Sequence, residues 1–218
     1  MNKDQAQNNE LAAIVLAAGA ARRFGKPKQL EPWPPGSGQS LVERAVRLTL
    51  EAFDGPVFVV LGNQRTAVQT ILETKFTPER VIPVYNPRWE EGQGYSVAAG
   101  VRAVRQAYPA VSGIMIMLTD QPRLKKQTLA ALVERFLELG EEGKDRILFP
   151  VFEGKRGNPA IFGQAFLEEL TRLEGDVGGR VLVRKYPTTI LEVPVSDPAI
   201  HEDADTPEEL AKLLEEPG

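Results

Sequence analysis

The chain has 218 residues, 42% of them hydrophobic, which is enough for one substantial domain. We expect a polar tail at residues 1–10 and a single domain at residues 11–218. The net charge of −4 argues against a nucleic-acid-binding protein, whose surface is broadly basic.

Two residue counts and one pattern narrow the classes further. The absence of cysteine and the single histidine exclude disulfides, thiolate nucleophiles and metal sites built on Cys or His clusters, so oxygen atoms must hold any metal. The first ten residues lack the apolar core of a signal peptide, and no later apolar run approaches the roughly 20 residues that span a bilayer. We therefore expect a soluble, cytoplasmic protein that does not bind a membrane.

The first predicted element is a buried strand that leads into a basic turn. The apolar residues 11–16 run into three small residues, and four cations follow closely: Arg22, Arg23, Lys26 and Lys28. A continuous apolar run is typical of a parallel sheet, which binds ligands at the carboxyl ends of its strands. Small residues there let backbone N–H groups and cations converge on phosphate, although such cations are also common in solvated loops.

The spacing in this turn excludes two common phosphate-binding motifs. A P-loop has four residues between its glycines and a hydroxyl residue after the lysine, whereas five residues separate Gly19 from Gly25 and Pro27 stands at the hydroxyl position. The dinucleotide fingerprint Gly-x-Gly-x-x-Gly would have Ala21 at its second glycine. A Walker A site and a Rossmann dehydrogenase are therefore not expected.

Strands and helices alternate through the rest of the chain. A capping box at Ser40 and Glu43 starts the first helix. We predict helices at about 41–53, 67–73, 96–107 and from 126, and strands at 56–61, 81–85, 113–118, 147–152 and 159–162. This order predicts an α/β fold in which helices cover both faces of a mostly parallel sheet.

Acidic residues follow two of these elements. Asp120 ends the strand at 113–118, where a carboxylate can place a hard cation against phosphate; terminating the strand or capping the helix near Lys126 explains it equally well. Asp203 and Asp205 precede a helix that a second capping box starts, at residues 206–209. Capping leaves these two carboxylates unexplained.

The segment at 86–96 admits several interpretations. Gly92 and Gly94 precede a helix whose free N–H groups can take anionic or carbonyl groups of a ligand, although a structural cap explains them as well. Residues 94–98 approximate a hydrolase nucleophile elbow around Ser96, but residues 88–93 are polar and do not form the strand that an elbow requires. We do not expect a hydrolase.

These segments resemble the motifs of small nucleotidyltransferases, especially molybdenum cofactor cytidylyltransferases. Residues 16–28 resemble LAAGxSxRMGxxK with Ala21 for the usual Ser, residues 119–122 resemble GDQP or GDMP with Thr119 for Gly, and residues 203–210 resemble DIDTPEDL. The matches extend from Leu16 to Leu210 in family order. The resemblance implies a three-layer sandwich around a Rossmann-like nucleotidyltransferase sheet.

For the nucleotide, the resemblance implies a triphosphate loop, two cations and a metal. The loop comprises Leu16, Ala17, Ala18 and Gly19. Arg23 and Lys28 neutralise the triphosphate, and Asp120 and Asp205 hold Mg²⁺. The family motif N-x5-G-x3-S, matched by Asn86, Gly92 and Ser96, surrounds the base and ribose.

For the second substrate, the resemblance implies two glycine-containing turns. A G-x-x-G-x-P element at residues 154–159 contains Gly157 and places Arg156 to meet an anion, and a GDxGxR turn contains Asp176 and Arg180. An ordinary hairpin turn and a loop that leads into a helix are the structural alternatives for these two segments.

The implied reaction is transfer of CMP from CTP to the phosphate of molybdopterin cofactor, with release of pyrophosphate and delivery to a molybdoenzyme or its chaperone. The acceptor phosphate is already ionised, so positioning and charge neutralisation suffice. We expect CTP to be preferred over GTP if the methyl group of Ala18, where guanylyl-transferring relatives carry Gly, faces the base. Alternatives are GTP-dependent transfer, transfer to a sugar or alcohol phosphate, a metal-dependent glycosyltransferase and a non-catalytic nucleotide sensor.

Overall fold

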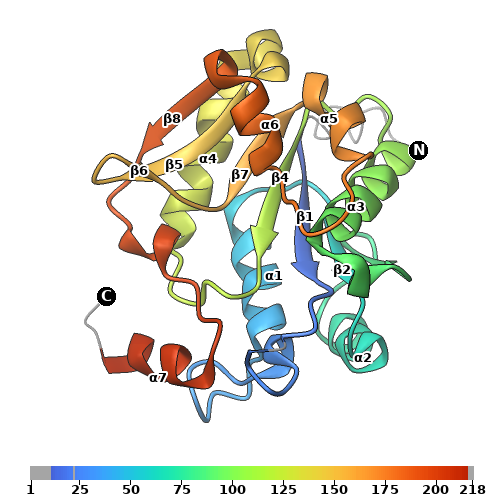
Figure 1. The fold of residues 1–218 in the computed structure, drawn as a ribbon, viewed down its shortest axis with the longest axis vertical. Helices are drawn as coiled ribbons and strands as arrows, with labels where there is room; N and C mark the ends of the chain where they lie inside the picture. Colours follow the sequence, from blue (N-terminus) through green and yellow to red (C-terminus); the bar gives the residue numbers. More distant parts are fainter. Residues whose placement is uncertain (1–10, 22, 216–218) are drawn as a thin grey trace.

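The computed structural model describes residues 11–21 and 23–215, so the predicted tail at 1–10 and the cation Arg22 lie outside the described residues. An eight-stranded sheet runs through the middle of the molecule in the order β3-β2-β1-β4-β7-β5-β6, with β8 paired to β5 (Figure 1). Its strands are β1 (Leu11–Ala17), β2 (Val57–Leu61), β3 (Val81–Tyr85), β4 (Gly113–Leu118), β5 (Ile147–Phe152), β6 (Lys155–Arg156), β7 (Ala160–Gly163) and β8 (Ile190–Pro194).

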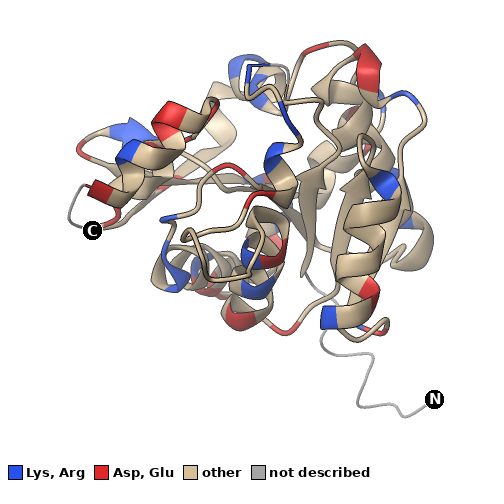
Figure 2. Cartoon of the chain, turned by 90° about the horizontal axis from the view of Figure 1, so that it is seen from below, with Lys and Arg blue, Asp and Glu red and all other residues tan. Residues whose placement is uncertain are grey.

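Helices cover both faces of this sheet. They are α1 (Leu41–Ala52), α2 (Arg65–Lys75), α3 (Gln93–Ala107), α4 (Lys126–Leu139), α5 (Gln164–Leu170), α6 (Arg180–Lys185) and α7 (Pro207–Glu215). Among the described residues, no helix has the length and apolar character needed to cross a membrane. Basic and acidic residues alternate along these elements in the view of Figure 2.

The sheet is mostly parallel, as predicted. β1 pairs in parallel with β2 and β4, β2 with β3, and β5 with β8, whereas β7 is antiparallel to β4 and β5. The register places Ala17 opposite Leu61, and Leu16 opposite Leu118. Three central strands therefore end at the same edge of the sheet, and the loops that follow them emerge side by side.

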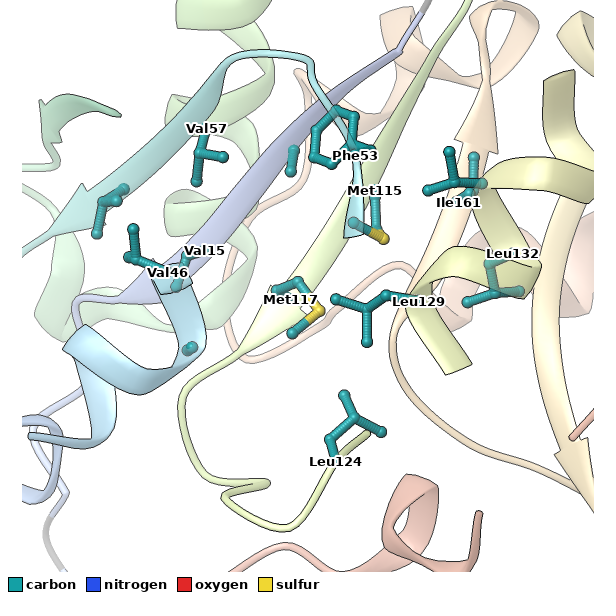
Figure 3. Packing of buried hydrophobic residues seen from close by; sticks show 14 of the residues in the cluster. Val15, Val46, Phe53, Val57, Met115, Met117, Leu124, Leu129, Leu132 and Ile161 are labelled. Carbon is teal, nitrogen blue, oxygen red and sulfur yellow. The ribbon is translucent and has the colours of Figure 1, made fainter. Parts of the chain in front are cut away.

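Alternation along β1 divides the core into two apolar layers. Ala13 and Val15 pack in a buried cluster with α1, α2 and α4, and Figure 3 shows Val15, Val46, Met117 and Leu129 meeting there. Ile14 and Leu16 pack on the opposite face with α3, α5 and α6. Each fully buried Leu, Ile or Val side chain contributes roughly 1.5–3 kcal/mol. The predicted three-layer sandwich is therefore confirmed.

A third, smaller cluster attaches the C-terminal segment to the basic turn. Phe24, Trp33 and Leu41 pack against Leu210 of α7, and Figure 1 shows α7 beside the blue segment that follows β1. The backbone N–H of Ala204 donates a 2.9 Å hydrogen bond to the carbonyl oxygen of Asp120. Residues 203–206, remote in sequence, are thereby fixed at the end of β4.

The local start signals are confirmed, and several boundaries shift. The Ser40 side chain accepts a hydrogen bond from the Glu43 N–H, and at α7 the Thr206 and Glu209 side chains each accept one from the other's backbone N–H. α2 begins at Arg65 rather than 67, and α3 begins at Gln93 rather than 96. The glycine at 94 therefore lies in the first turn of α3 instead of preceding it.

Candidate active site

A cavity of about 550 Å³ opens where β1 and β4 end. The turn after β1 forms one wall, the segment before α3 forms another, and the loops after β4 and before α7 close the remaining side. Its lining residues are Leu16, Ala17, Ala18, Gly19, Ala20, Ala21, Arg23, Lys28, Gln29, Trp89, Glu90, Glu91, Gly92, Gln93, Ser96, Leu118, Thr119, Asp120, Asp176 and Asp205.

Four charged side chains from three distant segments meet in this cavity. Lys28 Nζ lies 3.1 Å from Asp120 Oδ2 and 3.1 Å from Asp205 Oδ1. Arg23 Nη2 lies 2.5 Å from Asp205 Oδ2. The side chain of Lys28 is only 11% exposed, whereas that of Arg23 is 74% exposed. The structure thus brings the predicted phosphate-binding cations and the predicted metal-binding carboxylates together, and pairs them with each other.

Asp120 differs from an exposed aspartate in the pKa of its carboxyl group and in its hydrogen bonding. Desolvation raises the pKa of its carboxyl group, Lys28 opposes that shift, and the charges of Asp203 and Asp205 reinforce it. Its Oδ1 atom is buried and accepts no hydrogen bond. A buried polar group without a partner costs roughly 1–3 kcal/mol. The sequence therefore maintains an acceptor that the folded chain itself does not satisfy.

The helix-capping interpretation of Asp120 is wrong, because another carboxylate occupies that position. Asp197 Oδ2 accepts hydrogen bonds from the Lys125 backbone N–H at 2.9 Å and from the Thr128 hydroxyl at 2.6 Å. The second carboxylate oxygen of Asp197 accepts the Ala199 N–H at 3.2 Å. The start of α4 is therefore satisfied without Asp120.

The carboxylates fit a divalent metal ion that also binds phosphate. Mg²⁺ is commonly held by one or two carboxylates together with substrate phosphates, rather than by a cage of protein ligands. Asp120 supplies a buried, unpartnered oxygen, and Asp205 lies across the same lysine. Within residues 11–21 and 23–215 no group of three or more His, Cys, Asp or Glu side chains forms a ready-made metal site. Only the shared, phosphate-dependent mode fits this donor set.

The turn after β1 is held from several directions. Ala21 adopts a φ of 49°, in the left-handed region, and an added Cβ at Gly19 would meet no atom within 4 Å. The carbonyl oxygen of Ala18 accepts the Asn63 N–H at 3.1 Å, and Gln29 Nε2 donates to the Asn63 carbonyl oxygen at 3.0 Å. A ligand can thus approach the Gly19 backbone closely while the turn itself stays fixed.

Ala18 does not meet the condition on which the predicted CTP preference was based. It is 2% exposed, and its side chain belongs to the apolar cluster on the α3 face of the sheet. Its methyl group therefore offers almost no surface to a base. Any discrimination between CTP and GTP must come from other lining residues.

The segment at 86–96 has one residue beneath the cavity and others in its wall. Asn86 is 3% exposed and does not line the cavity: its Nδ2 donates to Ser96 Oγ at 3.0 Å, and its Oδ1 accepts the Arg88 N–H at 3.0 Å. Ser96 and Gly92 do line it. Asn86 therefore orients the wall rather than presenting its amide to the cavity.

The glycines in this segment permit a close approach between two loops. The N–H of Gly94 donates to the carbonyl oxygen of Gly175 at 2.9 Å, so this group is not free for a ligand. A Cβ added at Gly92, whose φ is 128°, would lie 2.2 Å from the Gly175 carbonyl carbon and 2.6 Å from the Asp176 nitrogen. The contact brings Asp176 into the cavity wall. The prediction of free N–H groups before this helix is wrong for Gly94.

The predicted acceptor residues are divided by the structure. Asp176 lines the cavity, whereas Arg156, Gly157 and Arg180 are not among the lining residues. Arg156 belongs to the two-stranded hairpin β5–β6, and its Nε lies 2.7 Å from Glu192 Oε1. A Cβ at Gly157 would lie 2.4 Å from the Ile200 carbonyl oxygen, so this glycine serves a backbone approach. Arg180 is exposed at the start of α6. Their contact with an acceptor stays a prediction.

Sequence reasoning missed several lining residues. Gln29 follows Lys28 and is 3% exposed, and a buried amide beside a catalytic candidate is a usable signal only once the fold is known. Trp89, Glu90 and Gln93 lie in a polar segment, where an isolated tryptophan is the one available clue. Their side chains add aromatic and polar groups to the cavity wall.

Comparison with known proteins identifies a family and full-length relatives for this chain. Residues 13–190 match the MobA-like NTP transferase domain. Nicotine blue oxidoreductase of Paenarthrobacter nicotinovorans is 30% identical over 213 residues, covering 94% of this chain and 96% of that protein. Purine catabolism protein PucB of Bacillus subtilis (strain 168) is 28% identical over 210 residues, covering 91% and 93%.

Solved structures agree with this result. Rv0371c from Mycobacterium tuberculosis H37Rv superposes with a TM-score of 0.73 at 28% identity, covering 95% of this chain and all (100%) of that one. A structure of Rv0371c in complex with manganese gives a TM-score of 0.70. Because the family match spans most of the chain and a relative of 30% identity covers nearly all of it, the chain belongs to the nucleotidyltransferase family of the MobA-like NTP transferase domain.

Proposed function

We propose that this nucleotidyltransferase moves CMP from CTP to the phosphate of molybdopterin cofactor and releases pyrophosphate, in the cytoplasm and with Mg²⁺. The observation that carries the proposal is the meeting of a small-residue turn, two cations and two carboxylates in one cavity. Family membership supports nucleotidyl transfer, and the sequence motifs support the cytidylyl donor and the molybdopterin acceptor.

In the proposed reaction, a phosphate oxygen of the acceptor forms a bond to the α-phosphorus of CTP. The bond from that phosphorus to the bridging oxygen of the β-phosphate breaks, and pyrophosphate leaves with the electron pair. The attacking oxygen is already ionised, so no side chain has to remove a proton. In-line positioning and neutralisation of developing charge are the contributions required of the protein.

The residues divide these contributions between them. Backbone groups of the turn at 16–21 face the phosphates, and Arg23 and Lys28 neutralise the leaving group. Asp120 and Asp205 would hold Mg²⁺, which when bound supplies Lewis-acid stabilisation of the phosphoryl oxygens. Trp89 and Ser96 also line the cavity, and in this proposal they contact the base and ribose.

Measuring pyrophosphate release for all four nucleoside triphosphates, with and without molybdopterin, tests the proposal. We expect release only when CTP and molybdopterin are both present. Release with GTP would change the donor, and release with a sugar or alcohol phosphate would change the acceptor. Formation of a nucleoside diphosphate from an added nucleotide sugar would indicate a glycosyltransferase. Tight nucleotide binding with no turnover for any acceptor would indicate the nucleotide sensor.

A further inference from the structure

The ammonium group of Lys28 lies between the two carboxylates that are predicted to hold a metal ion. Its ammonium nitrogen lies 3.1 Å from an oxygen of Asp120 and 3.1 Å from an oxygen of Asp205, and its side chain is 11% exposed. The remaining oxygen of Asp205 pairs with Arg23. Lys28, which a triphosphate would need, is therefore paired with Asp120 and Asp205, which a metal ion would need.

The charge of the cavity wall affects how each ligand can reach this ion pair. Five carboxylates among the described lining residues outnumber the two cations, Arg23 and Lys28. A metal-free triphosphate, which is strongly anionic, must approach this acidic wall and separate Lys28 from its partners. A metal ion without nucleotide must displace the same ammonium group. Each ligand alone meets an obstacle that the other ligand removes.

We propose that Lys28 is a surrogate cation that holds Asp120 and Asp205 together until a divalent metal replaces it, and that its ammonium group then transfers to the triphosphate. The inference rests on the proposed nucleotidyl transfer for the identity of the second partner. Because coupling between two binding equilibria is reciprocal, metal and nucleotide must strengthen each other's binding by the same factor.

The backbone around Lys28 is built for such an exchange. Lys28 begins a short 3-10 helix, Lys28–Leu30, in which the Leu30 N–H donates to the Pro27 carbonyl oxygen at 3.0 Å. The neighbouring Gln29 is anchored to Asn63. The main chain is thus fixed, while the four-carbon stem and point charge of a lysine allow its ammonium group to change partners.

Binding of Mn²⁺ to the free protein, measured by electron paramagnetic resonance without nucleotide, tests the first half. Lys28→Met removes the charge and retains a long side chain, so we expect Mn²⁺ to bind at least about tenfold more tightly than to wild type. Lys28→Arg retains a cation and should bind Mn²⁺ weakly. Lys26→Met is the matched control, because Lys26 lies in the same turn, pairs with Glu31 and does not line the cavity.

Binding of CTP in the presence of EDTA, measured by calorimetry, tests the second half. Asp120→Asn leaves Lys28 with Asp205 as its one carboxylate partner among the described residues and removes one repelling charge, so it should tighten metal-free CTP binding while it weakens Mn²⁺ binding. Lys28→Met should do the reverse. The opposite signs separate an exchange from a structural ion pair, whose loss in either variant would weaken both ligands.

The outcomes are decisive in each direction. Unchanged or weaker Mn²⁺ binding in Lys28→Met, with circular dichroism showing a folded chain, would overturn the proposal. If that variant does not fold, Lys28→Gln supplies the same comparison. Absence of CTP binding in wild type and in every variant even when Mn²⁺ is present would count against the proposed nucleotidyl transfer, whereas the Mn²⁺ measurement would still decide whether Lys28 occupies the metal position.

Discussion

Gly92 is the position at which one added methyl group should disturb the cavity most. In Gly92→Ala the new Cβ would lie 2.2 Å from both the carbonyl carbon and the oxygen of Gly175, on a backbone whose φ is 128°. Strain in such a conformation costs about 1–3 kcal/mol, and overpacking costs about 1–3 kcal/mol more. We expect a loss of about 2–6 kcal/mol in the free energy of unfolding, and a fall in Tm of at least roughly 4 °C.

The two loops can also relieve this clash by separating, so binding must be measured with stability. Separation would displace Gly92, which lines the cavity and belongs to the motif predicted to surround the base and ribose, and CTP with Mg²⁺ would then bind more weakly. Gly175→Ala is the matched control: its φ is 63°, but its added Cβ would meet no atom within 4 Å, so only backbone strain of about 1 kcal/mol is expected. Urea unfolding followed by circular dichroism gives stability, and calorimetry gives affinity. Equal stability and equal affinity in the two variants would refute the steric reasoning.

Three further predictions concern the two carboxylates and Trp89 of the cavity wall. Asp120→Asn and Asp205→Asn should each lower the rate of pyrophosphate release more than about tenfold in a folded protein, because each removes an anionic ligand; near-full Mg²⁺-dependent activity in either variant would contradict the two-carboxylate arrangement. Burial raises the pKa of Asp120, so ionisation of this carboxyl group lowers the free energy of unfolding as pH rises from about 4 through the folded-state pKa. Asp120→Asn should therefore gain stability relative to wild type over that pH interval in paired urea titrations. A stability difference that stays constant with pH would contradict the shift. Nucleotide binding should change the tryptophan fluorescence of wild type and of Trp33→Phe but not of Trp89→Phe, since of the two tryptophans only Trp89 lines the cavity; a retained change in Trp89→Phe would move the ligand elsewhere.

The central strands could be predicted from sequence because burial on both faces leaves a simple signal. β1 and β4 are continuous apolar runs, and their ends coincide with the change to small or polar residues at Ala17 and Thr119. The rule that ligands bind at the carboxyl ends of such strands made Asp120 a candidate, and its resemblance to the family motif favoured a ligand role over a structural one. The capping boxes could also be predicted, because their hydrogen bonds join residues that are three apart in the sequence.

The pairing inside the cavity could not be predicted in this way. Lys28 is separated from Asp120 by 92 residues and from Asp205 by 177, and no local pattern encodes which cation meets which carboxylate. The same limit applies to Gly92, whose requirement for glycine comes from the backbone of Gly175 rather than from its own turn. Motif spacing identifies residues that share a site, while their partners in the ligand-free protein depend on packing between remote loops.

The residues of the cavity are a better basis than the fold for assigning a reaction, because one relative of this chain has a name that denotes redox chemistry. One fold supports many reactions, and the 30% identity to nicotine blue oxidoreductase does not itself select among them. In this chain the turn after β1 does not follow the Gly-x-Gly-x-x-Gly spacing of a dinucleotide site. It presents two cations to a space bounded by carboxylates, one of which keeps a buried oxygen without a hydrogen-bond partner. A neutral substrate would offer neither a cation for that oxygen nor an anion for Arg23 and Lys28. A polyphosphate that arrives with a divalent metal satisfies both, and this requirement favours nucleotidyl transfer here.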